Sequence, residues 1–537
     1  MSTALAGVRD GGPMTGTAPL LRASFRHDGR MFAPWILIAT ALSASSMIYP
    51  YIFNTEQERQ AFAAAIGANP AIGLIFGPAF DLTTTDGFNA WRSLSIGGFL
   101  TALGVIFIVV KASRGQEDSG QAELLASGVL GREARLLTAL LMAGVCALAV
   151  GVVSFAFTVL CGGAWESSLL LSAGFTVTGL MFAAVAAVTA QIASDARTAT
   201  SIAVAVLGVL FVLRGFLYSV SAPRWTAWAN PLGWITETRP ATGNHWWPLL
   251  LGLAFAAVFV AIGFARQVSR DFGQGLIASR PGPARGTART PLALAIRINR
   301  GPVVSWSVAF VGLGVIFGYF IRTVRDLFSV NPALAEIFAK GATLPAELLA
   351  GFLATILTLI GIVAAIAGVQ IVNRVRTEEL EDRAEPVLAT AVSRSRYLAP
   401  SVLLAFAAPA LFILIAGVVI GALAAAAHIG LNFGYPPLQA VATIPAVWTV
   451  VALAVAVIGA RPRVQIASWA GVLVSFGLTL FGPSFKLPGW ALGISPYYHV
   501  PHVAAGTQDW RGLLWISLFT LAFLVIGFMG FRRRDVP

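Results

Sequence analysis

The chain has 537 residues, of which 57% are hydrophobic and only 11% are charged, and its formal net charge is +12. Soluble domains usually carry about 25% charged residues, so this composition excludes an ordinary soluble protein and indicates one that crosses a membrane many times. The positive charge does not indicate nucleic-acid binding, because the chain offers no soluble basic domain that could carry it.

The N-terminal stretch, residues 1–30, is basic and polar, and it is too long and too polar for a signal peptide. We therefore expect the first apolar run to remain in the protein as a membrane anchor. Residues 17–30 alternate apolar and basic positions, as in a helix that lies in the membrane interface. Its apolar face would carry Leu20, Leu21, Ser24 and Phe25, and its basic face Arg22, Arg26 and Arg30. The alternative is a disordered basic tail.

Twelve apolar runs are long enough to cross a bilayer as helices, which predicts an all-α fold of two six-helix halves. The first half, residues 31–266, has its runs at about 31–53, 93–113, 136–160, 167–192, 198–218 and 248–266. The second half, residues 303–531, has them at about 303–322, 351–373, 398–425, 438–459, 465–482 and 513–531. Residues 267–302 are rich in Gly, Pro and Arg, so we expect a basic linker, and its last part, 291–300, resembles the predicted interfacial helix.

Most of the 36 Lys and Arg residues fall on one side of the membrane if the N-terminus is cytoplasmic. They include those of the N-terminal region, of the linker and of the basic C-terminus, 532–537. This excess predicts a multi-pass protein of the cell membrane with both termini in the cytoplasm.

A polar segment rich in Glu and Arg lies at 114–135, between the second and third apolar runs, and returns at 376–397. We call these the first and the second polar segment. Five residues of the first recur 262 positions later: Arg114, Glu117, Ala122, Glu123 and Arg132 return as Arg376, Glu379, Ala384, Glu385 and Arg394. Residues 69–76 and 331–338 share five of eight residues at the same offset. Since each half has an even number of spans, we expect two parallel copies with a cavity between them.

The chain lacks the motifs of nucleotide-binding and hydrolytic sites: it has no P-loop, no His-Glu-x-x-His, no nucleophile elbow and no Cys/His cluster. None of the twelve runs contains Asp or Glu, which weakens the case for a proton-driven pump. Energy for uphill transport would then come from outside the chain.

The polar segments are where that energy could arrive. Glu117, Gly120 and Glu123 are three residues apart, which places both carboxylates on roughly one side of a short helix. A short charged helix between two spans suits the docking of a soluble partner, whereas a solvated loop with capping charges is the alternative. Because the polar segment occurs twice at the same offset, we favour docking of a partner over a solvated loop.

The order of interfacial helix, span, outer loop, span, Glu-rich cytoplasmic helix and four more spans resembles the permease of a type-2 ATP-binding cassette (ABC) exporter. The polar segments resemble that family's coupling helix, roughly Glu-Glu-x-x-Gly-x-x-Glu-Leu-Leu-x-x-Pro-Val-Ser-Arg. The positions that the resemblance assigns to coupling are Glu117, Gly120, Glu123 and Arg132 in the first segment and Glu379, Asp382, Glu385 and Arg394 in the second.

Three residues depart from the family pattern. Asp382 replaces a glycine, Pro386 interrupts the Leu-Leu pair, and Gly131 precedes Arg132 where a serine is expected. We therefore expect the two segments to make unequal contacts with a partner.

The resemblance implies a transport subunit rather than an enzyme, working with two copies of a separate ABC ATPase. That partner would bind ATP and Mg, and this chain would hold no cofactor. The fused form is similar to actinobacterial permeases assigned to export of polyketide antibiotics, tetronasin-like ionophores and multiple drugs. The alternatives are a proton-coupled drug transporter, an ABC exporter of lipid or peptide cargo, and a lipid-processing membrane enzyme.

Arg214 lies about four residues from the outer end of the fifth span. An arginine there usually extends to the interface, and the alternative is that it faces the cavity and contacts an amphiphilic substrate. The residues that we predict as candidates for the substrate cavity are Phe211, Arg214, Phe216 and Phe476.

Predictions also follow from two outer loops, two cysteines and two histidines. The outer loop before the last span of each half is rich in Pro and aromatic residues, which fits interfacial anchoring, and the resemblance implies short re-entrant helices there. Cys146 and Cys161 lie about 22 Å apart along one helix, too far for a disulfide. His499 and His502 have no further metal-ligating partner nearby in sequence, so no metal site is predicted.

Overall fold

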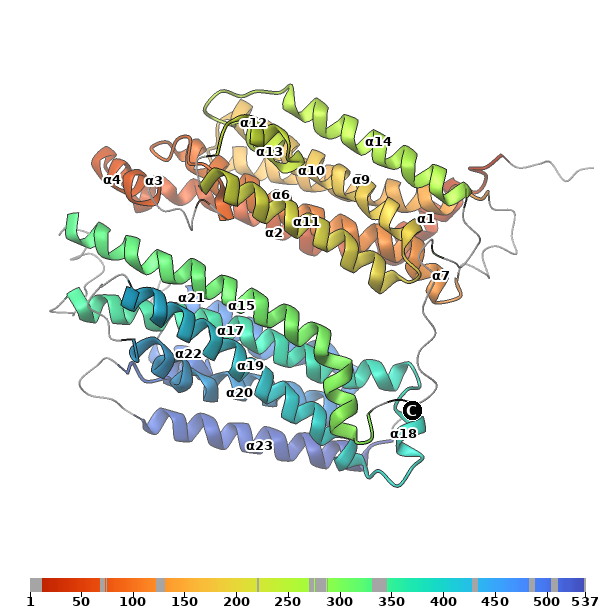
Figure 1. Ribbon diagram of the computed structural model, residues 1–537, viewed down its shortest axis with the longest axis vertical. Coiled ribbons are helices and arrows are strands. Elements are labelled where there is room, and N and C mark those ends of the chain that lie inside the picture. Colours follow the sequence, from red (N-terminus) through yellow and green to blue (C-terminus); the bar gives the residue numbers. More distant parts are fainter. Residues whose placement is uncertain are drawn as a thin grey trace, which may run out of the picture. The chain divides into compact units, whose positions relative to one another are not determined.

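The computed structural model describes residues 12–67, 73, 75–121, 131–219, 222–269, 275, 286, 288–330, 345–426, 433–481, 488–503 and 510–535. The chain divides into two compact units, Met1–Gly282 and Pro283–Pro537, and each is a bundle of helices (Figure 1). The division lies within the stretch 267–302, where the sequence predicts a linker.

The regular elements of the described residues are helices, and eleven of these are long and apolar enough to cross a membrane. The predicted all-α, multi-pass architecture is therefore confirmed. The remaining predicted span, 465–482, falls on a 3-10 turn, η4 (Pro462–Trp469), and on α21 (Ala470–Phe481), a helix of 12 residues. The number of twelve spans stays a prediction.

The first unit is a bundle of seven longer helices with several short ones between them. The longer helices are α1 (Thr17–Asp28), α2 (Ala33–Ser45), α6 (Thr85–Val110), α9 (Ala134–Leu160), α10 (Trp165–Ile192), α11 (Ala196–Ser219) and α14 (Pro248–Val268). The short ones include α3 (Tyr49–Ile52), α4 (Glu56–Gly67), α12 (Trp225–Trp228) and α13 (Pro231–Thr236).

Helix α10 is the centre of this bundle, because it contacts α6, α9, α11 and α14. Small residues let the helices approach: a Cβ on Gly97 of α6 would lie 2.5 Å from the ring of Phe175 of α10. Lipid tails are as apolar as leucine, so close packing of this kind, rather than the hydrophobic effect, drives helices together in a membrane.

The second unit repeats this plan around α20. Its helices are α15 (Pro291–Val330), α17 (Pro345–Leu380), α18 (Glu385–Leu388), α19 (Arg394–Ala426), α20 (Tyr435–Ala460), α21, α22 (Gly489–Leu492), the 3-10 turn η5 (Pro496–His499) and α23 (Arg511–Arg533). Helix α20 contacts α17, α19 and α23. Short helices precede the last span of each unit, as the resemblance implies.

The predicted interfacial helix forms as α1. Leu20 and Ser24 are buried, whereas Arg22 and Arg26 are exposed, so the predicted division into an apolar and a basic face is confirmed. Two 3-10 turns, η1 (Gly29–Phe32) and η2 (Ser46–Ile48), flank α2. In the second unit the corresponding residues begin α15, which runs on into the span and bends along its course (Figure 1). Pro302 lies inside this helix, where it removes a backbone hydrogen bond and accounts for a bend.

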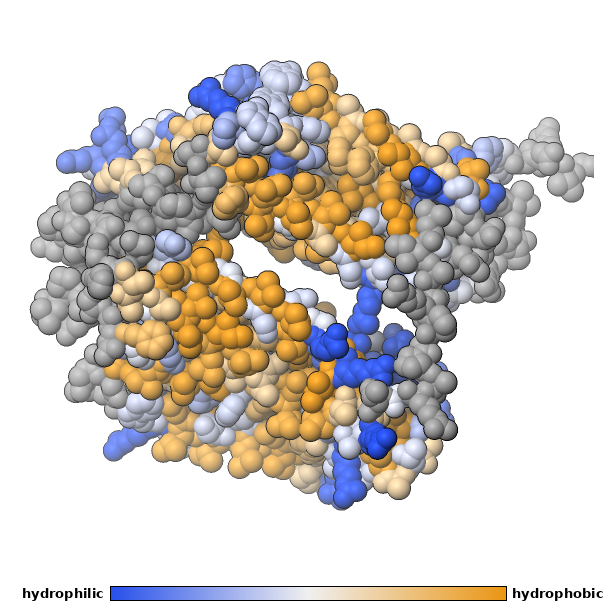
Figure 2. Space-filling model, in the orientation of Figure 1, coloured by the Kyte–Doolittle hydropathy of each residue, from blue (hydrophilic) through white to orange (hydrophobic). Residues whose placement is uncertain are grey.

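The sides of both bundles are apolar, as Figure 2 shows by the residues coloured as hydrophobic. Large apolar side chains such as Leu148 and Val152 of α9 are more than half exposed. A surface of this kind is stable against lipid tails and not against water. Cys161 is exposed and Cys146 buried, and both are free thiols.

Candidate functional site

The first polar segment begins as an extension of α6. After Val110 the helix continues as one π-helical stretch, η3 (Lys111–Gly115), and then as α7 (Gln116–Asp118). Gly120 follows with φ +72°, a left-handed conformation that glycine adopts without steric cost. The extension ends there. Single π-helical turns inside helices occur frequently at functional sites.

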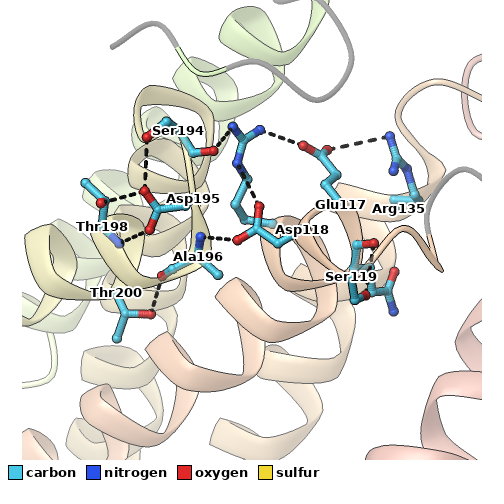
Figure 3. Close-up of polar contacts among 11 residues, drawn as sticks. Glu117, Asp118, Ser119, Arg135, Ser194, Asp195, Ala196, Thr198 and Thr200 are labelled. Atoms are coloured by element: carbon cyan, nitrogen blue, oxygen red, sulfur yellow. Dashed lines mark hydrogen bonds and ion pairs between the residues drawn. The ribbon is translucent and has the colours of Figure 1, made fainter. Parts of the chain in front are cut away.

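A buried ion pair holds this extension. The guanidinium of Arg114 donates to Glu117 Oε2 at 2.6 Å, and Arg135 Nη2 lies 3.7 Å from Glu117 Oε1 (Figure 3). The Arg114 side chain is 0% exposed and that of Glu117 7%. A charge buried this deeply is stable only with a partner, and removing one member of such a pair typically costs about 3–5 kcal/mol.

The same extension is tied to the start of α11. Arg114 Nη2 donates to the carbonyl oxygen of Ser194 at 2.5 Å, and Asp118 Oδ2 accepts from the amide of Ala196 at 2.6 Å. Asp195, which lies between them (Figure 3), caps α11 by accepting from the Thr198 amide at 2.8 Å. The end of α6 and the first turn of α11 therefore form one hydrogen-bonded block.

The ionisation of Asp195 fits this capping role. Burial opposes ionisation of its carboxyl group, but hydrogen bonds from Thr198 and Ser194 outweigh burial and lower its pKa below the ordinary value. The negative charge at the N-terminus of α11 is also favoured by the helix dipole.

An N-terminal stretch closes the other end of the segment. The amide of Gly131 donates to the Thr15 carbonyl and that of Glu133 to the Pro13 carbonyl, each at 2.9 Å. A Cβ at position 131 would collide with the Pro13 carbonyl, so only glycine allows this approach. The departure from the family's serine therefore has a structural reason.

The second polar segment has the same core. Helix α17 runs on through Arg376, whose Nη1 donates to Glu379 Oε2 at 2.9 Å. The Glu379 side chain is 0% exposed. Arg534, just beyond α23, also donates to the carboxylate of Glu379, and its Nε donates to the Gly459 carbonyl at 3.0 Å. Glu379, like Glu117, therefore lies between two arginines.

The turn after each pair has one backbone pattern. The amide of Gly120 donates to the Glu117 carbonyl, and that of Asp382 to the Glu379 carbonyl, each at 3.2 Å. Asp382 has φ +56°, close to that of Gly120 although its side chain disfavours this conformation. The aspartate therefore keeps the family's turn at a cost in strain.

Pro386, which interrupts the Leu-Leu pair of the family pattern, does not interrupt a helix. It lies in the first turn of α18, where a proline has no hydrogen bond to lose and its fixed φ suits the helix. The exposed charged residues of this part of the second segment are Glu381, Asp382, Arg383 and Glu385.

The expectation of one short helix carrying both glutamates of the first segment stays a prediction, because Glu123 lies outside the described residues. The extension that carries Glu117 ends at the left-handed residue Gly120. Glu117 and Glu379 are buried in ion pairs, so they position the segments rather than offer their carboxylates to a partner.

Arg132 and Arg394 correspond in the repeat, but they differ in exposure and in hydrogen bonds. Arg132 is exposed, and its carbonyl accepts from Gln267 Nε2 at 2.7 Å. Arg394 is half-buried and donates to the carbonyl oxygens of Arg532 and Arg534 at 3.1 and 2.5 Å. Sequence reasoning missed Arg534, because no local pattern links it to a glutamate 155 positions away.

The cavity candidates do not share one environment. Arg214 is 3% exposed and lines a cavity of the first unit, and Phe211 packs against its guanidinium at 4.8 Å. Phe216 is 51% exposed and Phe476 45%. Arg214 therefore does not extend to the surface, while the roles of Phe216 and Phe476 stay predictions. His499 bonds the Gly493 carbonyl through its ring nitrogen.

Comparison with known proteins finds a matching family model in each unit. The family model described as "ABC-2 type transporter" matches residues 51–238, and the one described as "Multidrug efflux system permease Rv1217c, C-terminal domain" matches residues 289–532. The chain is 36% identical over 539 residues to the multidrug efflux system permease protein Rv1217c of Mycobacterium tuberculosis (strain ATCC 25618 / H37Rv). The alignment covers 98% of this chain and 96% of that relative.

Proposed function

The chain belongs to the ABC-2 type transporter family and is the membrane permease of an ABC exporter, and we propose that it moves amphiphilic drugs, including polyketide-type antibiotics, out of the cell. A permease of this family works with a partner ATPase. We infer that two copies of that ATPase bind one permease chain, and that ATP and Mg are held by the partner.

The observation that carries this proposal is the recurrence of one structure in both units. In each, a span helix continues beyond the apolar run, buries a glutamate between two arginines and ends in a left-handed residue. A solvated loop would not need a buried ion pair to fix its geometry. Two fixed extensions per chain suit two copies of an ATPase.

The geometry also suggests how movement at the first polar segment would reach the substrate. Arg114 and Asp118 bond the turn that starts α11, so a push on the segment would displace α11 as a rigid rod. Helix α11 carries Phe211 and Arg214 about 22–27 Å further along its axis. Closure of the ATPase on ATP would thereby reorient the residues that face the cargo.

The second unit has a corresponding connection. Asn373 Nδ2 of α17 donates to Ser468 Oγ at 2.9 Å, just before α21 begins. Helix α21 carries Phe476. In each unit, therefore, the helix that carries a polar segment is bonded to the start, or to the turn just before the start, of a later helix that holds a cargo candidate.

The test is export with and without the partner. The permease is reconstituted in vesicles with its partner ATPase, and accumulation of a fluorescent amphiphilic drug is followed. We expect ATP-dependent transport that stops when the ATP site of the partner is disabled. ATP hydrolysis by this chain alone, or drug export that persists with the disabled partner and follows a proton gradient, would contradict the proposal.

Cargo of another kind gives a different result in the same assay. Labelled phospholipid or peptide would then be transported in place of the drug, and ATP dependence would remain. This outcome would replace the cargo and keep the exporter.

The proposed orientation can be tested with a native thiol. We infer that both termini are cytoplasmic, which places Cys161, at the end of α9 remote from the first polar segment, outside the cell. A membrane-impermeant maleimide should label intact cells at Cys161, and the Cys161→Ser variant should not be labelled because Cys146 is buried. Labelling only after lysis would reverse the orientation.

A further inference from the structure

The first unit contains a cavity of about 310 Å³ beside the far end of α11. Its walls include Phe80, Arg214, Tyr218, Arg224, Glu237 and Arg239. A volume of this size lies at the lower end of the range for small-molecule pockets, so it can take the head and part of the body of a drug-sized molecule.

Arg214 has neutral partners in this pocket. Its Nη1 donates to Ser95 Oγ at 2.5 Å and its Nη2 to the Ile75 carbonyl at 2.8 Å. No carboxylate of the described residues forms an ion pair with it, and its buried Nε has no hydrogen-bond partner among them. A buried guanidinium without a counter-charge is costly, since buried charges are normally paired.

The other charges of the lining increase the positive excess. Arg239 holds Glu237 with two hydrogen bonds, from Nε at 3.0 Å and from Nη2 at 2.5 Å, and the Tyr218 hydroxyl donates to the same carboxylate at 2.9 Å. Glu237 is therefore already occupied. Among the described lining residues the charged ones are three arginines and one glutamate, which favours an anion.

The backbone of the wall is strained near these residues. Arg239, Ala241 and Asn244 all have positive φ, at +46°, +69° and +47°. Each such residue outside glycine costs of order 1 kcal/mol, and strain of this kind clusters at functional sites. The strained turn holds Arg239 over the ring of Phe80, at 4.3 Å from the centroid.

The second unit shows that this charge is not a general feature of the fold. A cavity of about 330 Å³ in that unit, also near the short helices before the last span, has Gln439, Thr355 and Tyr498 in its lining, and none of the described lining residues is Arg, Lys, Asp or Glu. At the offset of the repeat, Arg214 is matched by Phe476. The charged pocket belongs to the first unit.

We propose that this cavity binds the anionic head of an amphiphile, a carboxylate in the first instance, with Arg214 as its anchor. The planar guanidinium can hold a carboxylate with two parallel hydrogen bonds, and Phe80 and Leu217 of the lining supply apolar surface for the body. As a statement about cargo, the inference rests on the proposed function: it names acidic amphiphiles as a class that the exporter carries.

The experiment measures binding to the permease in lipid nanodiscs, without the ATPase. The probes are 2-naphthylacetic acid and its methyl ester, which share an apolar body and differ in charge at pH 7.4. Equilibrium dialysis gives both affinities, with empty nanodiscs subtracted. We expect the acid to bind about tenfold more tightly than the ester, as a charged hydrogen bond allows.

Variants test whether Arg214 causes the preference for the acid over the ester. Arg214→Gln should bring the ratio of acid to ester affinity to within about twofold of one, whereas Arg214→Lys, which retains the charge, should keep most of it. The matched control is Arg92→Gln, since Arg92 is a half-buried arginine of the same unit that bonds Ser46 and does not line the cavity.

Two results would overturn the inference: equal binding of acid and ester by the unaltered protein, or an unchanged ratio in Arg214→Gln. Equal binding by the unaltered protein overturns the inference even if Arg214→Gln fails to fold. Because the assay needs neither ATP nor transport, its failure leaves the exporter proposal standing, and failure of transport leaves a measured anion site standing.

Discussion

The two polar segments share a buried glutamate and the left-handed turn that follows it, but they obtain the second arginine from different parts of the chain. In the first unit it is Arg135, in the helix that follows the segment. In the second unit Tyr397 occupies the corresponding position and stacks on Phe531 with ring centroids 6.2 Å apart, and Arg534 supplies the charge instead.

This difference shows that both units retain a glutamate between two arginines, although the second arginine does not come from the same sequence position. Each glutamate is held by one arginine three residues earlier and by a second from outside the helix. Arg534 also packs over Phe531, at 4.6 Å from the ring centroid, so Phe531 both stacks on Tyr397 and orients the replacement charge. Tyr397, where the first unit has an arginine, and Arg534, which pairs with Glu379, therefore belong to one arrangement around Phe531.

The largest expected effect is a difference in stability between variants of Arg114 and Arg376, the arginines that precede each buried glutamate by three residues. Arg114→Met removes a side chain that is 0% exposed and takes from the Glu117 carboxylate the guanidinium that contacts it at 2.6 Å, so we expect a loss of stability of about 3–5 kcal/mol. Arg376→Met should cost less, because Arg376 is partly exposed and Arg534 still pairs with Glu379. Thermal unfolding followed by size-exclusion chromatography measures both.

The control for this pair is Arg22→Met, an exposed arginine of α1 that should change stability by no more than about 0.5 kcal/mol. Equal melting shifts for Arg114→Met and Arg376→Met would contradict the difference in burial.

The next prediction compares Arg135 and Arg534, the second arginine beside each buried glutamate. Arg534→Ala should lower drug-stimulated ATPase activity of the complex more than Arg135→Ala does, because Arg534 contacts Glu379 closely whereas Arg135 lies 3.7 Å from Glu117. Leaving a buried carboxylate with one fewer charged donor costs about 1.5–3 kcal/mol. A larger loss in Arg135→Ala would show that the contact distances do not set the coupling.

A swap tests whether the two arrangements are equivalent. Tyr397→Arg places an arginine where the first unit has Arg135, so in the Arg534→Ala background it should restore at least half of the lost ATPase stimulation. Tyr397→Phe in the same background is the matched control and should restore nothing. Failure of the arginine variant, with the protein folded, would mean that position 534 does more than supply charge.

The smallest effect concerns the turns. Gly120→Ala adds a Cβ in a left-handed conformation, with open space around it, so only backbone strain opposes it and we expect a loss of about 1 kcal/mol. Asp382→Gly should relieve strain at the equivalent position and stabilise the protein by a few tenths of a kcal/mol at most, since glycine also favours the unfolded chain. A shift of the same sign in both variants would contradict the equivalence of the turns.

The sequence predicts the architecture well because its signals are strong and local. Apolar runs and the alternating face of α1 each follow from residues near one another, and the repeat follows from direct comparison of two stretches of the sequence. The pairing of Arg114 with Glu117 is local too, at a spacing that helices allow, although burial of the pair does not follow from it.

The sequence fails where the outcome depends on distant parts of the chain. The turn at Asp382 cannot be foreseen, because aspartate disfavours a left-handed backbone and only its glycine counterpart in the repeat hints at it. The requirement for Gly131 arises from Pro13, more than a hundred residues earlier. The role of Arg534 depends on how α23 packs against α20.

The central claim is that the exposed charged part of the second polar segment contacts the partner ATPase. The most direct measurement is the affinity of the ATPase for the permease in nanodiscs, with Glu385→Lys compared to Glu56→Lys, an exposed glutamate of α4 outside the polar segments. Neither change should alter stability by more than about 0.5 kcal/mol. We predict that Glu385→Lys weakens binding about tenfold and that Glu56→Lys has no effect. Equal affinity for both variants would contradict the assignment of this segment as the docking site.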